Sequence, residues 1–222
     1  MKIKHTEAWL VVMLVGSYIT CQLIADVGAS RFVQVGGLAF SGGTFVYGLT
    51  FTLRDLIHKH LGKEYARAAI AAAAVFNIFL SGYLFLVSLL AAPVWYAHRA
   101  AWDTIFSLVP AITIGSIIAE FLSEMIDTEV YALWTKKLPK APQWSRVLVS
   151  NMISIPVDSL LFCTLAFSIV PKLLGAEGIS FKDALIFATG GQIIYKTLVT
   201  LVSLPFIYFV KDKANNKDYR TT

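Results

Sequence analysis

The sequence contains few charged residues for its length. Charged side chains make up 15% of the 222 residues and apolar ones 57%, with a mean hydropathy of +0.67, whereas an ordinary soluble domain carries about 25% charge. Such a chain needs lipid as its solvent, and its length holds about six spans of roughly 20 residues. The composition therefore predicts an all-α membrane protein, one domain over residues 1–222, with helices at about 8–28, 36–57, 65–91, 103–133, 145–171 and 182–211.

Cysteine and histidine are scarce, and this argues against several kinds of chemistry. The two cysteines, Cys21 and Cys163, fall inside apolar runs, where a cysteine behaves as a small hydrophobic residue. All four histidines lie outside the predicted spans or at their ends, so a catalytic metal would lack its imidazole ligands. The sequence has no Walker pattern for ATP. We therefore expect no metal, no cofactor and no enzymatic activity.

The basic residues are distributed unevenly between the predicted loops. Fourteen of the 19 Lys and Arg residues fall in the stretches 2–4, 54–67, 136–146 and 211–220, which alternate connections place on one side. Cytoplasmic loops of membrane proteins carry such an excess. We therefore expect both termini in the cytoplasm, with the tail after residue 211 solvated. This asymmetry explains the net charge of +5 without a nucleic-acid partner.

Four polar residues share one face of the fourth predicted helix. Glu120, Ser123, Glu124 and Asp127 are spaced 0, 3, 4 and 7, which aligns them on a helix. A charge inside hydrocarbon costs at least about 2.5 kcal/mol, so these carboxylates need a reason to be there. They are candidates for ligand contact or proton transfer. A solvated helix end, or pairing with a basic loop residue, is the alternative for them.

A second polar set lies on the fifth and sixth predicted helices. Asn151, Ser154 and Asp158 share a face or its edge, and Gln192 and Lys196 lie one turn apart. Asp158 and Lys196 are both expected near the bilayer midplane, so on depth Asp158 is the natural partner of Lys196. The set favours a substrate site, and a purely structural ion pair is the alternative.

The second predicted helix closes on Arg54 and Asp55. Asp55 is a site candidate, and we interpret Arg54 as an anchor at the cytoplasmic surface. Carboxylates, amides and aromatic rings together would suit a flat heterocycle with several N–H donors. The same residues would also accept a cation or a small acid, so they do not select the ligand.

Four stretches in order resemble the signatures of one family. They are Phe51–Gly62 (FTLRDLIHKHLG), Ser123–Tyr131 (SEMIDTEVY), Ser150–Phe162 (SNMISIPVDSLLF), and Lys196 followed by an apolar run to Pro205. The family is that of the queuosine precursor transporters, also called the vitamin uptake transporter family. Its matched positions are Asp55, Asp127, Asp158 and Lys196, and Glu124 falls where the family tends to carry Glu or Gln. Asp26 and Arg31 have no matched position.

The resemblance implies uptake of a 7-deazaguanine, 7-cyano-7-deazaguanine or its aminomethyl relative, across the bacterial inner membrane. It also implies a six-helix bundle similar in shape to the substrate-binding subunits of energy-coupling-factor transporters. Four hypotheses follow: a secondary transporter, a binding subunit energised by a partner ATPase, an intramembrane enzyme, and an assembly subunit without a small ligand. The absence of histidine from the spans disfavours the enzyme. The sequence leaves the oligomeric state open, including a homodimer or a complex with a coupling subunit.

Overall fold

The computed structural model describes residues 5–210. The predictions about Lys2, Lys4, the tail after residue 210 and the end of the last helix at 211 lie outside the described residues. Within the described part, five helical stretches are long and apolar enough to cross a membrane: Ala8–Gly28, Lys63–Leu89, Arg99–Lys137, Gln143–Leu173 and Phe181–Phe209. They agree with five of the six predicted spans and confirm a predominantly α-helical membrane protein.

The first and third predicted helices are continuous, as α1 (His5–Gly28) and α3 (Lys63–Leu89). The later ones are built from shorter pieces. The fourth comprises α4 (Arg99–Phe106) and α5 (Val109–Lys137), and the fifth comprises α6 (Gln143–Thr164), the π-helical turn η1 (Leu165–Ile169) and α7 (Val170–Leu173). The sixth comprises α8 (Phe181–Phe187), the π-helical turn η2 (Ala188–Gln192), α9 (Ile193–Ser203) and the 3-10 helix η3 (Leu204–Phe209). Single π-helical turns inside α-helices are frequent at functional sites.

The second helix differs from its predicted bounds of 36–57. The structure has α2 at Thr44–Leu61, and a β-hairpin of β1 (Phe32–Val35) and β2 (Leu38–Ser41) precedes it. Gly36 and Gly37 form the two-residue turn with φ of 57° and 80°, which is the backbone that a tight hairpin requires and that glycine adopts without strain. Two adjacent glycines between apolar residues are a hairpin signal, and the helix prediction overlooked it.

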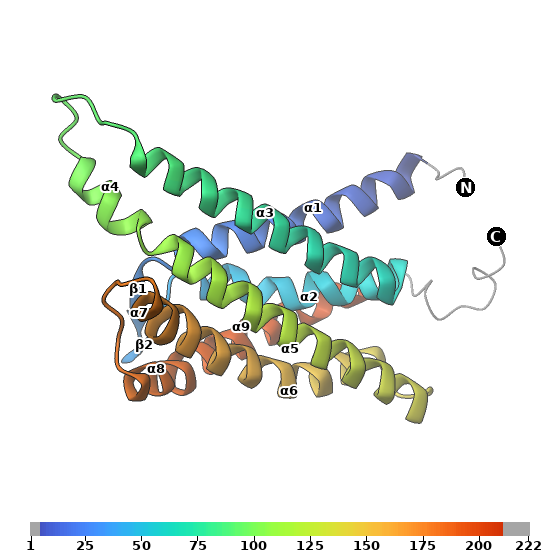
Figure 1. The fold of residues 1–222 in the computed structure, drawn as a ribbon. Helices are drawn as coiled ribbons and strands as arrows, with labels where there is room; N and C mark the ends of the chain where they lie inside the picture. Colours follow the sequence, from blue (N-terminus) through green and yellow to red (C-terminus); the bar gives the residue numbers. More distant parts are fainter. Residues whose placement is uncertain (1–4, 211–222) are drawn as a thin grey trace.

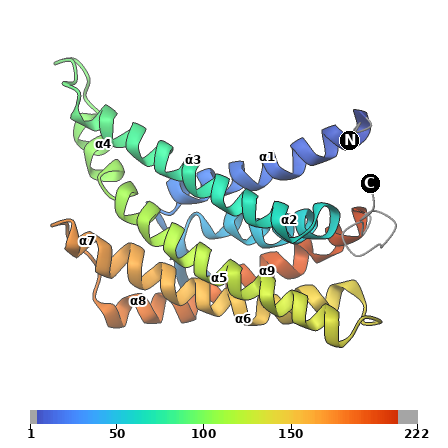
Figure 2. The ribbon, with the colours of Figure 1, turned by 45° about the vertical axis from the view of Figure 1, so that its right-hand side comes forward.

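The bundle has two distinct ends (Figure 1). The first turns of α1, the α2–α3 junction and the α5–α6 connection lie at one end, and the hairpin, α4 and the connection from α7 to α8 lie at the other. Figure 2 shows α5 and α6 side by side, with α1 and α3 crossing above them. The helix α2 lies inside this arrangement, where it contacts α1, α3 and α9.

Small residues bring α3 close to its neighbours. Ala66, Ala69 and Ala73 are buried in one cluster with Leu14 and Tyr18 of α1. In a membrane the hydrophobic effect does not drive helices together, and small side chains promote association because they let the helix backbones approach closely. This alanine-rich face of α3 therefore lies inside the bundle.

The interior buries many polar groups, whereas the outer surface exposes large apolar side chains. Large hydrophobic side chains such as Val75, Phe79 and Met152 are exposed, as lipid-facing residues are. Six carboxyl groups are buried with at most 2% of their surface exposed: Asp26, Asp55, Glu120, Glu124, Asp127 and Asp158. Charged residues in membrane helices face the bundle interior and pair with one another, so these side chains define the region where function is expected.

Candidate functional site

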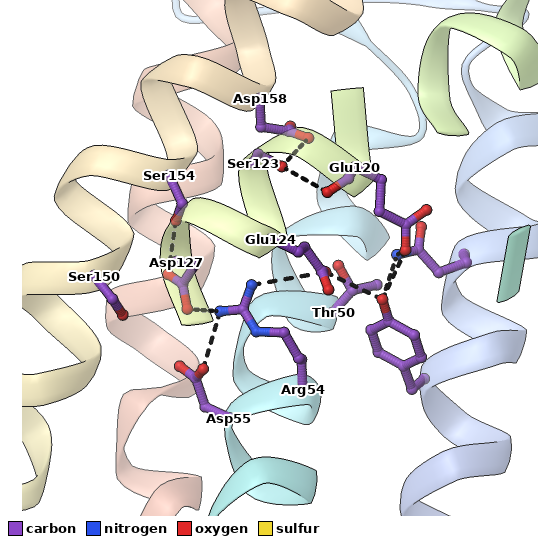
Figure 3. A network of polar contacts seen from close by, with 12 residues as sticks. Thr50, Arg54, Asp55, Glu120, Ser123, Glu124, Asp127, Ser150, Ser154 and Asp158 are labelled. Carbon is purple, nitrogen blue, oxygen red and sulfur yellow. Dashed lines mark hydrogen bonds and ion pairs between the residues drawn. The ribbon is translucent and has the colours of Figure 1, made fainter. Parts of the chain in front are cut away.

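Arg54 stands at the centre of the first buried cluster. Its guanidinium lies 2.9 Å from Asp55 Oδ1, 2.6 Å from Asp127 Oδ2 and 3.7 Å from Glu124 Oε1. Figure 3 shows the side chain reaching from α2 between these carboxylates, two of which come from α5. A delocalised guanidinium suits several carboxylates at once. The cluster therefore joins α2 to α5 by charge.

The sequence interpretation of Arg54 as a surface anchor is wrong. The side chain is only 2% exposed, and its partners come from two helices. An arginine that is buried and shared by three carboxylates faces the bundle interior and is not exposed to the lipid headgroups. Asp55, by contrast, was a predicted site residue, and the structure brings it together with Asp127 and Glu124 around this arginine.

Ser154 extends the Arg54 cluster to α6. Its hydroxyl donates a hydrogen bond of 2.8 Å to Asp127 Oδ1, and Asp127 Oδ2 contacts Arg54. Both oxygens of Asp127 are thus occupied. The three residues predicted to share a face of this helix or its edge, Asn151, Ser154 and Asp158, are all buried.

Tyr18 and Gln22 of α1 contact the carboxylates on the neighbouring face of α5. The Tyr18 hydroxyl lies 2.7 Å from Glu120 Oε1 and 3.1 Å from Glu124 Oε1, and the Gln22 amide donates to Glu120 Oε1 at 2.5 Å. The second oxygens of Glu120 and Glu124 are buried and have no hydrogen-bond partner among residues 5–210. This group, Tyr18, Gln22, Glu120 and Glu124, is called the α1–α5 cluster below.

Lys196 and Asp158 form an ion pair between α9 and α6. The Lys196 Nζ lies 2.5 Å from Asp158 Oδ2, while Tyr47 and Ser123 donate to Asp158 Oδ1 at 2.9 and 3.1 Å. The ammonium also lies 4.4 Å from the Tyr47 ring centre and 5.4 Å from the Phe162 ring centre, which adds cation–π attraction. The sequence predicted the two residues at the same depth, and the structure shows that they touch.

Gln192 contacts the hairpin and the first residue of α2. It accepts a hydrogen bond of 2.7 Å from Thr44 and donates one of 2.9 Å to Ser41, and it belongs to the π-helical turn one turn before Lys196. Gly191 permits the close packing there, because a Cβ at this position would overlap the Ala39 carbonyl. The hairpin thus closes over the start of α9.

A small cavity lies beside these groups. Asp26, Ser116, Gln192 and Lys196 are among its lining residues, and Asp26 Oδ2 is buried with no partner in the described chain. The cavity measures about 10 Å³, which is the space that one water molecule needs. Asn151 is also buried, and neither atom of its amide is hydrogen-bonded within residues 5–210. Several polar atoms at the core therefore have unused bonding capacity.

Tyr18, Gln22 and Tyr47 also contact the predicted carboxylates, although they were absent from the predicted site. Tyr18, Gln22 and Asp26 follow one another at intervals of four, a helical stripe on the first span that pattern analysis could have identified. Tyr47 gave no such signal, because the residues around it were assigned wrong helix bounds. No group of three or more His, Cys, Asp or Glu side chains in the described chain is arranged to hold a metal ion.

Comparison with known proteins assigns this architecture to a family. The family described as "Putative vitamin uptake transporter" matches residues 41–210. The chain belongs to this transporter family. A relative in Bacillus subtilis (strain 168), named "Probable queuosine precursor transporter", is 25% identical over 195 residues, which cover 87% of this chain and 81% of the relative. No solved structure matches the chain.

Membership in the vitamin uptake transporter family identifies the chain as a transporter rather than an enzyme. Together with the five apolar helices, it identifies a multi-pass protein of the bacterial inner membrane. The family match begins at Ser41 and so includes all the site residues except those on α1. The predicted family and class of protein are therefore confirmed.

Proposed function

We propose that the chain imports a queuosine precursor, 7-cyano-7-deazaguanine or 7-aminomethyl-7-deazaguanine, into the bacterial cell. The printed name of the Bacillus relative supports this substrate class. The observation that carries the proposal in this chain is the buried polar core, in which carboxylate and amide groups retain unpaired atoms. A membrane protein has little reason to bury such groups unless a polar ligand completes their hydrogen bonds.

The proposed binding site is the region between α6 and α9, near the bilayer midplane. Asp158, held by Lys196, would accept the two parallel N–H groups of a guanine-like edge in exchange for the hydroxyls of Tyr47 and Ser123. The side-chain amides of Gln192 and Asn151 would donate hydrogen bonds to the carbonyl oxygen of the base. The remaining predicted site residues line the same core towards the α2–α3 end: Glu120, Glu124, Asp127, Asp55 and Ser154.

Binding at this place requires the helices to separate. The cavity beside Asp26 and Lys196 is about 10 Å³, whereas small-molecule pockets usually measure about 300–1,000 Å³. The structure therefore represents a closed form for this substrate. The π-helical turn before Lys196 and the hairpin contacts of Gln192 lie where such an opening would have to occur.

We also propose six spans with both termini in the cytoplasm, in the arrangement that the resemblance implies for energy-coupling-factor binding subunits. The basic residues Lys59, Lys63, Arg67, Lys136 and Lys137 support this orientation, since they gather at the end of the bundle where α1 begins. The sixth span in this proposal is α2. Attachment of a membrane-impermeant reagent to cysteines placed at either end would test the orientation.

Direct binding tests the proposed function. Purified chain is titrated with 7-cyano-7-deazaguanine, with guanine as competitor, for the wild type, Asp158→Asn and the half-exposed control Asp103→Asn. Loss of a charge-assisted hydrogen bond of about 1.5–3 kcal/mol predicts roughly tenfold to hundredfold weaker binding for Asp158→Asn, with Asp103→Asn unchanged. Absence of binding by a monodisperse and thermally stable wild type would overturn the proposal for this chain acting alone.

The same protein in liposomes distinguishes two ways of driving uptake. Accumulation of labelled substrate by liposomes that contain only this chain would identify a self-sufficient transporter. Binding without accumulation would identify a binding subunit that needs an energising partner.

A further inference from the structure

We propose that the α1–α5 cluster is a proton-binding site of the transporter, separate from the Asp158–Lys196 site. The role of the proton in transport rests on the proposed function. Its presence is argued from hydrogen-bond geometry alone. The cluster lies across the interface of α1 and α5, next to the Arg54 group in Figure 3.

The number of available hydrogens carries the argument. The Tyr18 hydroxyl has one hydrogen to donate, and its oxygen lies 2.7 Å from Glu120 Oε1 and 3.1 Å from Glu124 Oε1. The Gln22 Nε2 atom lies 3.2 Å from the Tyr18 hydroxyl oxygen and 2.5 Å from Glu120 Oε1, so it can donate to either of them. It makes no hydrogen bond to Glu124. If both carboxylates were ionised, the Tyr18 hydrogen could serve only one of them. The Tyr18 oxygen and the oxygen of the other carboxylate would then face each other with no hydrogen between them. A proton on Glu120 or Glu124 removes that conflict.

The carboxylate oxygens without partners also support a bound proton. Oε2 of Glu120 and Oε2 of Glu124 are buried without a donor among the described residues. The two glutamates lie one turn apart on α5 and are at most 1% exposed. Two ionised carboxylates at this separation, away from water, repel strongly, so a shared proton lowers the energy of the closed form.

The surrounding charges do not neutralise both glutamates. Arg54 lies 3.7 Å from Glu124 but is 2.6 Å from Asp127 and 2.9 Å from Asp55, and Lys196 is paired with Asp158. The buried face of α3, which also packs on α5, carries no titratable side chain. The titratable and charged groups around the cluster are Asp26 of α1, Tyr47, Arg54 and Asp55 of α2, Asp127 of α5, Asp158 of α6 and Lys196 of α9. Together with Glu120 and Glu124 of the cluster, this region holds six carboxyl groups and two cations.

Proton binding would control the contact between α1 and α5. With a proton present, Tyr18 bridges the two glutamates and the helices stay together. When the O–H bond breaks and the proton leaves to the cytoplasmic water, the carboxylates repel each other and Tyr18 can hold only one of them. The next proton comes from the outer water, so no other reactant is needed. Import would therefore be driven by a proton gradient directed inward.

Infrared difference spectroscopy of the purified, ligand-free chain tests the proton directly. We expect a band of a protonated carboxylic acid that Glu120→Gln or Glu124→Gln removes or diminishes and that the exposed control Glu177→Gln leaves in place. Tyr18→Phe keeps both glutamates but should shift the band, because the acid loses its hydroxyl partner. This variant also decides the matter if a glutamine variant fails to fold. A spectrum in which none of the three changes alters the band would overturn the proposal.

Gradient-driven uptake tests the role of the proton. With an inside-alkaline gradient of one pH unit, one coupled proton gives wild-type liposomes about tenfold accumulation, which Glu177→Gln should retain and Glu124→Gln should lose. Wild-type uptake that ignores the pH gradient, or that follows a sodium gradient instead, would overturn proton coupling. A wild type that shows the infrared band but transports no deazaguanine would refute the proposed substrate and leave the proton site standing.

Discussion

Two of the buried cations of this protein, Lys196 and Arg54, are paired in different ways. Lys196 meets one carboxylate, Asp158, whose oxygens are both occupied by Lys196, Tyr47 and Ser123. Arg54 meets three carboxylates, and among residues 5–210 one oxygen of Asp55 and one of Glu124 remain without a donor. The Lys196 pair is therefore balanced in charge, and both oxygens of Asp158 have a donor. The region around Arg54 has an excess of negative charge, which leaves room for protons.

Removal of Arg54 should have the largest effect. Arg54→Met leaves Asp55, Asp127 and Glu124 without their cation, and loss of one side of a buried ion pair costs about 3–5 kcal/mol of folding stability. Acid should restore part of the loss, because the folded variant then binds more protons than the unfolded chain and its stability rises as pH falls. Unfolding in detergent at several pH values measures both effects. The partly exposed Arg67→Met is the control, and a loss that is equal at every pH would contradict the charge-excess argument.

Lys196→Met should cost somewhat less, at about 3 kcal/mol, because a single carboxylate is left unpaired. The double variant Lys196→Met with Asp158→Asn should recover much of that stability, since no buried charge then remains at the site. The corresponding double variant at Arg54 and Asp127 should recover little, because Asp55 and Glu124 persist. A double-mutant cycle on thermal unfolding gives the two coupling energies. Equal recovery of stability by the two double variants would show that the Lys196 and Arg54 sites do not differ in charge balance.

Sequence spacing could predict many of the residues in these buried groups, but which residues pair with which depends on tertiary structure. The intervals within single helices identified Glu120, Ser123, Glu124 and Asp127, because helical geometry alone places them on one face. Which helix faces that stripe depends on rotation about the helix axis, which spacing does not contain. Arg54 was therefore interpreted by its position near a helix end, although the chain turns it inward towards α5.

The hairpin shows a second limit of the sequence. An apolar stretch with two glycines was interpreted as part of a span, whereas Gly36 and Gly37 reverse the chain and α2 begins only at Thr44. The error moved Tyr47 from the first turn of α2 to the middle of a longer helix. Its contact with Asp158 could not be expected from that placement.

The packing of η2 beneath the hairpin should matter less than either ion pair, and it offers a matched pair of variants. Gly191→Ala would place a methyl group into the Ala39 backbone, whereas the Cβ of Gly190→Ala would lie 4.0 Å from Leu38. Overpacking costs about 1–3 kcal/mol, so Gly191→Ala should lower the melting temperature and Gly190→Ala should not. Gln192 adjoins Gly191, so the same variant should also weaken substrate binding on the Lys196 side. Equal stabilities of the two variants would argue against close contact of the hairpin with η2.

The serines that contact the two clusters should give the smallest effects. Ser154→Ala removes a 2.8 Å bond to Asp127 and Ser123→Ala a 3.1 Å bond to Asp158, each to a charged acceptor and worth about 1–2 kcal/mol. Asp158 keeps two other partners, so Ser123→Ala should be the milder change. The exposed Ser107→Ala serves as control, and melting curves compare the three. A larger loss for Ser123→Ala would mean that Lys196 and Tyr47 do not compensate for the missing bond at Asp158.

The composition of α2 has a consequence for the way the protein is made. The helix has 18 residues, about 27 Å at 1.5 Å per residue, so it can nearly cross the hydrocarbon. It carries Arg54, Asp55 and Lys59, each of which opposes entry into lipid by about 2.5–3.5 kcal/mol at the centre of a span. A ribosome-bound chain that ends soon after residue 61 would thus hold an α2 that cannot insert stably by itself. In the proposed six-span arrangement, the partners that would stabilise inserted α2 include Asp127 and Glu124 of α5, which are synthesised more than sixty residues later. Insertion of α2 would then be completed only after α5 has been made.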